Sequence, residues 1–187
     1  MSKLLVLIVL AVLQSACMTQ PQHITGSTAA HTTAELKQWQ ASGRIGITAI
    51  DQSGSGGFIW EQNEAVSQIQ LRGPVGVGSL AVSVDGSGLS LLSSEGTSYS
   101  ESDALLVMQE KLGVVLPVTQ LRYWLLGTAA PSTYRWLDAT HQLLEQDGWL
   151  ITYQQWTERN QLSLPIRLIL QQGAVRIVVV IQAWNLS

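Results

Sequence analysis

Cys17 is the only cysteine in this 187-residue chain, and its surroundings suggest the chemistry of its thiol. It follows Lys3, a run of apolar residues (4–13, LLVLIVLAVL) and the small residues Ser15 and Ala16. The run is too short to span a bilayer core but is typical of the apolar part of an export signal. With no second cysteine in the chain, the thiol cannot form an internal disulfide. This pattern favours covalent modification of Cys17.

The segment around Cys17 resembles a bacterial lipobox, in which the cysteine is lipidated and becomes the first residue of the mature protein. One position departs from that pattern: Gln14 stands three residues before the cysteine, where Leu is usual, and Leu13 lies one residue further back. The alternative is an ordinary secretory signal that is cut near Ala16 and leaves Cys17 unmodified. The resemblance implies a lipoprotein signal peptide over residues 1–16.

Residues 17–36 then form the lipidated N-terminus and a polar tether, rich in Thr, Gln and Ala. One acyl chain anchors a protein only marginally, whereas two or more anchor it stably. Lipoproteins of the kind that this segment resembles carry three chains, palmitate among them. Met18, rather than Asp, follows the cysteine, and by analogy with known sorting this favours the outer membrane.

The remaining polar residues form no pattern typical of catalysis or metal binding. His23 and His31 lie eight residues apart in the tether without companions, and His141 stands alone on an expected strand. The 13 acidic residues are scattered, and none pairs with a base or nucleophile in an apolar stretch. We therefore expect no enzyme activity, no cofactor and no metal site.

The composition also limits the classes of partner. Hydrophobic residues make up 46% of the chain and charged residues only 12%, against about 25% in typical domains. The formal net charge is −3 and no basic cluster is present, so we expect no nucleic-acid binding. The chain has seven Trp but one Phe, and Trp suits half-buried surfaces and pocket walls.

Short segments in which apolar and polar residues alternate run through most of the chain after Trp39. Period-two alternation over several short segments is typical of an antiparallel sheet with one apolar face. The segments are 45–49, 58–62, 67–72, 80–85, 87–96, 133–138, 141–146, 149–156, 164–173 and 174–184. The glycine-rich stretch SGSGG (53–57) is interpreted as a flexible loop between strands.

Two helices are expected in the middle of the chain. The first begins at Ser100, with Asp103 in the position of a capping box, and ends at Gly113. The second, LPVTQLRYWLLG (116–127), has Pro117 as its first helical residue and ends at its glycine. Strands at both ends of the chain with helices between them predict an α+β fold, in which helices cover a curved antiparallel sheet.

The turn LRGPVGVGSL (71–80) has Val75 at its tip, where hairpins normally carry Asn, Asp or Gly. Its glycines do not suit a phosphate-binding loop, because an alternating strand follows them rather than a helix. An aliphatic side chain at such a tip needs an apolar partner. The alternative is that Val75 folds back onto the sheet.

Five features in this order resemble the LolB family of outer-membrane lipoprotein receptors: the lipobox cysteine, the strand ending at Trp60, the LRGPVGVGSL turn, the LPVTQLRYWLLG helix, and GWLITY (148–153) followed by two terminal strands. The resemblance covers nearly the whole mature chain. It implies one domain over residues 37–187, an incomplete, half-open antiparallel β-barrel of about eleven strands that is covered by helices and encloses an apolar cavity.

The resemblance also implies a function. Members of the family accept lipoproteins from the periplasmic carrier LolA through an acyl-chain cavity and insert them into the outer membrane, where the receptor faces the periplasm. An exposed hydrophobic residue at the hairpin tip, here Val75, contacts the membrane lipid. A monomer is the simplest state, because the receiving mouth must stay open. The alternative is a structural or assembly-scaffold envelope lipoprotein with no lipid-carrying cavity.

The apolar faces of the expected strands supply the candidate ligand-binding residues, although half of them would be ordinary packed core in the alternative interpretation. They are Ile45, Ile47, Phe58, Trp60, Ile69, Leu71, Ile151, Tyr153, Leu168, Ile177 and Val179. Trp124, Trp149 and Trp184 resemble tryptophans of the family and shape either the cavity or only the fold.

Overall fold

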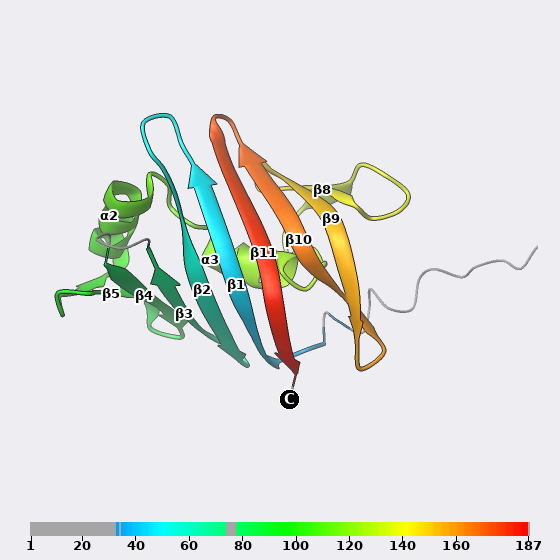
Figure 1. Cartoon of the computed structure of the whole chain (residues 1–187), viewed down its shortest axis with the longest axis horizontal. Coiled ribbons are helices and arrows are strands. Elements are labelled where there is room, and N and C mark those ends of the chain that lie inside the picture. Colours follow the sequence, from blue (N-terminus) through cyan, green and yellow to red (C-terminus); the bar gives the residue numbers. More distant parts are fainter. Residues whose placement is uncertain (1–32, 34, 74–77, 187) are drawn as a thin grey trace, which may run out of the picture.

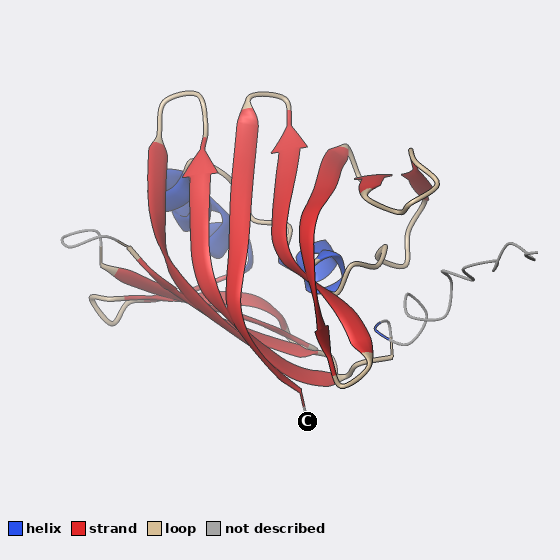
Figure 2. Cartoon of the chain, turned by 45° about the vertical axis from the view of Figure 1, so that its right-hand side comes forward, coloured by secondary structure: helices blue, strands red, loops and turns tan. Residues whose placement is uncertain are grey.

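The computed structural model describes residues 33, 35–73 and 78–186. Cys17, the signal segment and Val75 lie outside the described residues. One antiparallel sheet holds all eleven strands, and two helices pack on one of its faces (Figures 1 and 2). The strands are β1 (Gln38–Thr48), β2 (Ser53–Asn63), β3 (Val66–Arg72), β4 (Ser79–Asp85), β5 (Gly88–Ser93), β6 (Ser98–Ser100), β7 (Tyr134–Trp136), β8 (Leu143–Gln146), β9 (Trp149–Arg159), β10 (Leu162–Gln172) and β11 (Val175–Leu186). The helices are α2 (Glu101–Leu112) and α3 (Val118–Trp124).

The sheet is open and strongly curved, as expected for an incomplete barrel. Its strand order is β6-β5-β4-β3-β2-β1-β11-β10-β9-β8-β7, so every neighbour is also adjacent in sequence except β1 and β11. The helices connect the two edge strands, β6 and β7, and lie on the concave side (Figure 2). The predicted fold class is therefore confirmed, including the number of strands. Strand β6 was not predicted from the residues, because three residues are too few to show alternation.

Apolar and polar side chains alternate along each strand, so the apolar ones point to the concave face. Those of neighbouring strands form rows that run across the sheet. Ile45 on β1 is paired with Val179 on β11, which is paired with Leu168 on β10 and, through it, with Tyr153 on β9. All four side chains are buried. The row shows why the expected apolar faces of separate strands form one continuous wall.

Gly43 lies at a close approach between the backbones of β1 and β11. The register between these strands shifts between Ser42 and Gly43, which marks a β-bulge. A Cβ atom at residue 43 would lie 2.0 Å from the carbonyl oxygen of Val180, so only glycine fits. The bulge therefore contributes to the bend of the sheet in its central strand pair.

The interpretation of SGSGG as a loop is wrong, because these residues are the first half of β2. Gly54 is paired with Ile47 and Gly56 with Ile45, so both glycines are part of the ladder. Low strand propensity made the stretch look like a loop, whereas pairing with β1 overrides that propensity. A Cβ atom at Gly56 would lie 2.2 Å from the carbonyl oxygen of Arg72, which explains a glycine inside this strand.

The ends of the helices differ in part from the expectation. Ser100 is the N-cap of α2, but its side chain makes no capping hydrogen bond, so the predicted capping box is wrong. Gly113 ends α2 in the left-handed conformation, with φ 73°, and its N–H donates to the carbonyl oxygen of Gln109, as expected for a C-cap glycine. Pro117 precedes α3 as its N-cap instead of being its first residue.

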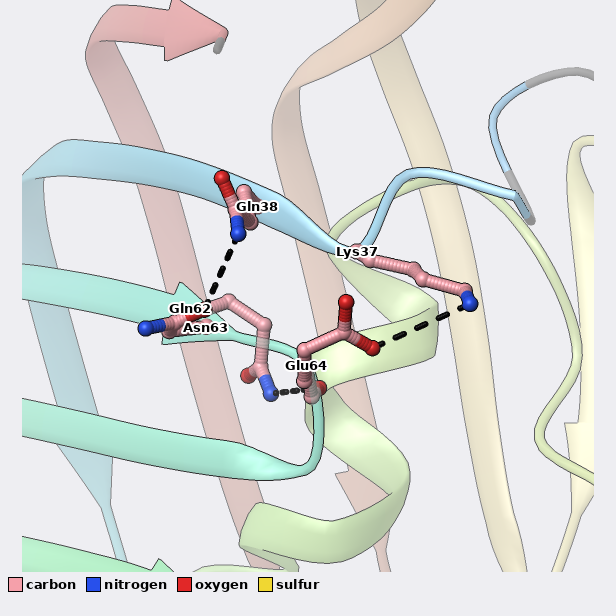
Figure 3. Close-up of polar contacts among 5 residues, drawn as sticks. All are labelled: Lys37, Gln38, Gln62, Asn63 and Glu64. Atoms are coloured by element: carbon pink, nitrogen blue, oxygen red, sulfur yellow. Dashed lines mark hydrogen bonds and ion pairs between the residues drawn. The ribbon is translucent and has the colours of Figure 1, made fainter.

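At the end of the sheet where β1 begins, polar side chains join β1 to the β2–β3 turn (Figure 3). Gln62 is buried, and its Nε2 donates to the carbonyl oxygen of Glu64 at 3.0 Å. Its Oε1 accepts from Trp60 Nε1 at 3.1 Å and from Ser67 Oγ at 2.7 Å. The ion pair between Lys37 and Glu64, at 3.8 Å, is exposed and contributes little. Gln62 therefore ties this end together by satisfying buried donors.

We expect the substitution Gly43→Ala to lower the free energy of unfolding by about 3 kcal/mol, because the added methyl group overlaps the backbone of β11. Gly54→Ala is the matched control, since no atom lies within 4 Å of a Cβ there, and it should change the free energy by less than about 0.5 kcal/mol. Urea unfolding followed by tryptophan fluorescence measures both. Equal effects of the two substitutions would contradict the close approach.

Candidate functional site

The concave face of the sheet and helix α3 enclose a small apolar cavity. Its volume is only about 20 Å³, because side chains from α3 and the sheet fill most of the space. Leu121 on α3 and Leu125, the C-cap residue of α3, line it together with Phe58 and Trp60 on β2. The cavity is lined by Ile45, Phe58, Trp60, Ile69, Leu71, Leu116, Leu121, Leu125 and Val179, all of them apolar. In this conformation the interior is a packed core with a small void.

A larger cavity, of about 180 Å³, opens between the β1–β2 hairpin, the end of β3 and the C-terminal end of α2. We call it the mouth; it is lined by Ile45, Ile47, Gln52–Gly57, Leu71–Gly73, Lys111 and Leu112. Ile45 and Leu71 line both the mouth and the interior cavity. The two cavities are therefore neighbours that share an apolar wall.

Glycines in β2 create the mouth. The strand points residues 54, 56, 58 and 60 toward the concave face, and the last two are the buried Phe58 and Trp60. The first two are Gly54 and Gly56, which have no side chains to cover Ile45 and Ile47 opposite them. Aromatic side chains therefore fill the space over the second half of β2, whereas the space over its first half stays open.

The charged groups at the mouth are cationic. Arg72 and Lys111 line it, and no acidic residue does. Both side chains are exposed; Arg72 donates to Gln70 Oε1 at 3.3 Å, and Lys111 lies 3.3 Å from the Glu110 carboxylate. The Arg72 side chain lies with Gln70 on the convex face of β3, and Lys111 is paired with Glu110, so neither residue gives the apolar wall of the mouth an unpaired positive charge.

The eleven candidate ligand-binding residues all lie buried on the concave face. Seven line one or both cavities: Ile45, Ile47, Phe58, Trp60, Ile69, Leu71 and Val179. The other four, Ile151, Tyr153, Leu168 and Ile177, continue the same wall on β9, β10 and β11 but line neither cavity. Sequence reasoning missed Gly54 and Gly56, although their spacing from Phe58 and Trp60 carried the signal.

Gln146 is a second buried amide that sequence reasoning missed. Its Oε1 accepts from Trp124 Nε1 at 2.8 Å and from the backbone N–H of Ala130 at 2.9 Å. Its Nε2 donates to the carbonyl oxygen of Ala130 and to Ser132 Oγ, both at 2.8 Å. The side chain is 1% exposed. This one amide fixes α3 and the following loop against β8.

The three tryptophans singled out in the sequence hold elements together. Trp124 on α3 lies near Trp149 on β9, with ring centroids 6.3 Å apart. Trp184 on β11 packs edge-on against Trp39 on β1 and donates from Nε1 to the carbonyl oxygen of Pro165 at 3.1 Å. None of the three lines the interior cavity or the mouth. In this conformation they contribute to the fold.

Tyr153 has an unusual environment. Its ring lies near those of Trp136 and Trp156, with centroids 6.1 Å and 5.3 Å away, and the residue is 1% exposed. Its hydroxyl is the one buried side-chain polar atom, among the residues described, without a hydrogen-bond partner. Burial raises the pKa of this hydroxyl well above its ordinary value. A buried hydroxyl without a partner costs about 1–3 kcal/mol, so its presence needs an explanation.

Within the described part of the chain, no three His, Cys, Asp or Glu residues are grouped so that they could bind a metal ion. His141 packs edge-on against Trp136, with ring centroids 4.8 Å apart. Neither described helix has the length and hydrophobicity needed to cross a membrane. The described residues thus offer apolar cavities and no group of metal ligands.

The family model described as "Outer membrane lipoprotein LolB" matches residues 37–184, which include both described helices and all of the strands except the last two residues of β11. The chain belongs to the LolB family. Proteins named outer-membrane lipoprotein LolB from Marinomonas sp. and Francisella tularensis are each 31% identical to it, covering 92% and 98% of the chain and 92% and 94% of their own lengths. That of Pseudomonas aeruginosa is 38% identical, over 81% of this chain and 76% of its own length.

Membership in the LolB family confirms the resemblance found in the sequence. The relatives are named outer-membrane lipoproteins, which supports a location in the outer membrane and a part in lipoprotein transport for this chain. The matched region begins at the residue where the expected domain begins.

We expect Gln146→Ala to lower the free energy of unfolding by about 3 kcal/mol, because Trp124 Nε1 and the N–H of Ala130 lose their acceptor inside the protein. Gln68→Ala, at an exposed position on β3, is the control and should have an effect below about 0.5 kcal/mol. Thermal unfolding followed by circular dichroism measures the difference. A small effect at residue 146 would show that α3 is held by other contacts.

Proposed function

We propose that this chain is a receptor that accepts acylated lipoproteins from the soluble periplasmic carrier LolA and inserts them into the outer membrane. The observation that carries the proposal is the mouth, an apolar cavity that shares Ile45 and Leu71 with the interior. An acyl chain has almost no polar groups, so its binding site must be apolar and needs few directional contacts. The continuous concave wall supports such a site.

Acyl-chain uptake requires the helices to move away from the sheet, because the interior cavity of about 20 Å³ is far smaller than the roughly 300–1,000 Å³ of typical ligand pockets. Helix α2 is suited to move. Of its residues, only Ala104 and Met108 are buried, and Leu106 is 68% exposed. Each methylene that enters the apolar interior contributes about 0.8 kcal/mol, which offsets the cost of displacing a helix. The transfer needs no energy from nucleotide hydrolysis if the acyl chain passes to progressively more apolar sites.

The Val75 tip delivers the cargo to the bilayer in this proposal. It belongs to the connection between Arg72 on β3 and Ser79 on β4, which are paired at the base of the hairpin. Transfer of one Val side chain from water into lipid contributes about 1.5–3 kcal/mol. Lipidated Cys17 would hold the receptor at the same membrane, facing the periplasm, and the tether would let the domain reach both the carrier and the lipid.

A scaffold lipoprotein is the second candidate, and two observations favour it. The interior is largely filled by the protein's own side chains. In addition, Leu105 and Leu106 on α2 and Leu92 on β5 are exposed, as expected for a surface that binds another protein. Uptake of an acylated cysteine peptide distinguishes the two functions. A chain that begins at Met18 retains every described element and serves for this test.

We expect Gly54→Trp to weaken binding of a triacylated cysteine peptide at least tenfold, because the indole would grow into the open space of the mouth. Gly54→Ala should bind as the unsubstituted chain does. Tryptophan fluorescence titration measures both dissociation constants. Binding that is unaffected by either substitution would show that the acyl chains do not enter through the mouth.

We expect Val75→Glu to leave uptake from loaded LolA intact while reducing transfer into outer-membrane vesicles at least tenfold, because a carboxylate cannot enter lipid without a large desolvation cost. Ser79→Glu places the same charge at the base of the hairpin and should transfer normally. The two steps are followed separately, by co-purification of cargo and by its appearance in the vesicles. Loss of both steps in Val75→Glu would contradict a separate role for the tip.

A further inference from the structure

The hydroxyl of Tyr153 differs from the other buried side-chain polar atoms of the residues that the structure describes. The buried amides of Gln62 and Gln146 have partners for both their oxygen and their nitrogen. The indole N–H groups of Trp60 and Trp124 also donate hydrogen bonds. Tyr153 Oη alone is buried without a partner in the part of the chain that the structure describes.

Tyr153 lines neither cavity in this conformation, but it lies on the same concave wall as residues that do. Its backbone N–H donates to the carbonyl oxygen of Gln142 at 2.8 Å, which fixes this part of β9. Its ring lies in the row that runs through Leu168 and Val179 to Ile45, the residue shared by the mouth and the interior cavity. The hydroxyl is therefore a hydrogen-bond donor placed on an otherwise apolar wall.

We propose that Tyr153 donates a hydrogen bond from its hydroxyl to the carbonyl oxygen of an ester that links an acyl chain to glycerol in the bound lipid. This inference rests on the proposed function and adds a specificity-determining residue to it. An ester carbonyl is an acceptor that needs a partner once its chains leave water. The Tyr153 hydroxyl, buried by Trp136 and Trp156, supplies a donor without adding a charge to the interior.

Two lipids carry such esters: the diacylglyceryl cysteine of a lipoprotein cargo and the glycerophospholipid of the membrane. The experiment therefore uses two matched pairs of probes with the chain that begins at Met18. One pair is a diacylglyceryl cysteine peptide and its dialkyl ether analogue; the other is a diacyl phosphatidylethanolamine and its dialkyl ether. Trp136 and Trp156 lie beside Tyr153, so their fluorescence reports binding.

The unsubstituted chain should bind the ester form of the cargo peptide about fivefold more tightly than the ether form, which is the factor that one net hydrogen bond provides. Tyr153→Phe should bind both forms equally, with the affinity that the unsubstituted chain has for the ether. Its melting temperature without lipid should not fall, because the hydroxyl has no partner to lose. Tyr134→Phe, at a position that is 52% exposed, is the control and should keep the preference for the ester.

The same preference in the phospholipid pair instead of the peptide pair would support the ester contact and assign it to membrane lipid. Equal binding of the ester and ether forms by the unsubstituted chain would overturn the inference about Tyr153 but leave the proposed receptor function intact. A preference that persists in Tyr153→Phe, or a large fall in its melting temperature without lipid, would also overturn it. If neither cysteine peptide nor phospholipid binds to the unsubstituted chain, the receptor function fails and the inference fails with it.

Discussion

Strand β1 pairs with strand β11 in the centre of the sheet, and the rest of the structure is built outward from this pair. The two strands lie at opposite ends of the described chain, so their pairing is the most costly in chain entropy and links two separate meanders. Once it forms, the concave sides of β2 to β6 and of β7 to β10 become one wall. Gly43 permits this pairing, because its position against Val180 leaves no room for a side chain. Loss of this pair would leave two smaller sheets, each with an uncovered apolar face.

A wall of this kind must be covered without being sealed. Polar contacts hold the cover in place at defined points: the buried amide of Gln146 ties α3 and its following loop to β8, and the exposed Gln52 donates from Nε2 to the carbonyl oxygen of Glu110 near the C-terminal end of α2. Between these points the helices rest on apolar contacts, which are non-directional and can be exchanged for contacts with an acyl chain. The small interior cavity then belongs to the closed conformation without ligand, and an acyl chain would enlarge it by replacing these apolar contacts.

Satisfied and unsatisfied polar groups have different meanings in such an interior. Gln62 and Gln146 have hydrogen-bond partners inside the protein for both the oxygen and the nitrogen of their amides, so they stabilise this one arrangement. Tyr153 does not, and its cost is tolerated beside Trp136 and Trp156. The two halves of β2 show a similar contrast in packing. Gly54 and Gly56 leave the apolar wall beside them uncovered, whereas Phe58 and Trp60 fill the space over it a few residues later.

Alternation of apolar and polar residues was sufficient to predict most of the strands, the α+β class and the concave face, because a period of two is a local property of the chain. The ordered motifs were sufficient to predict the family. Local rules failed where pairing overrides propensity, as in SGSGG, and where a strand is as short as β6. Only the tertiary structure decided which apolar residues line a cavity and which are packed core. That choice depends on where α2 and α3 lie on the sheet, and on contacts such as that between Trp124 and Gln146, which join residues distant in sequence.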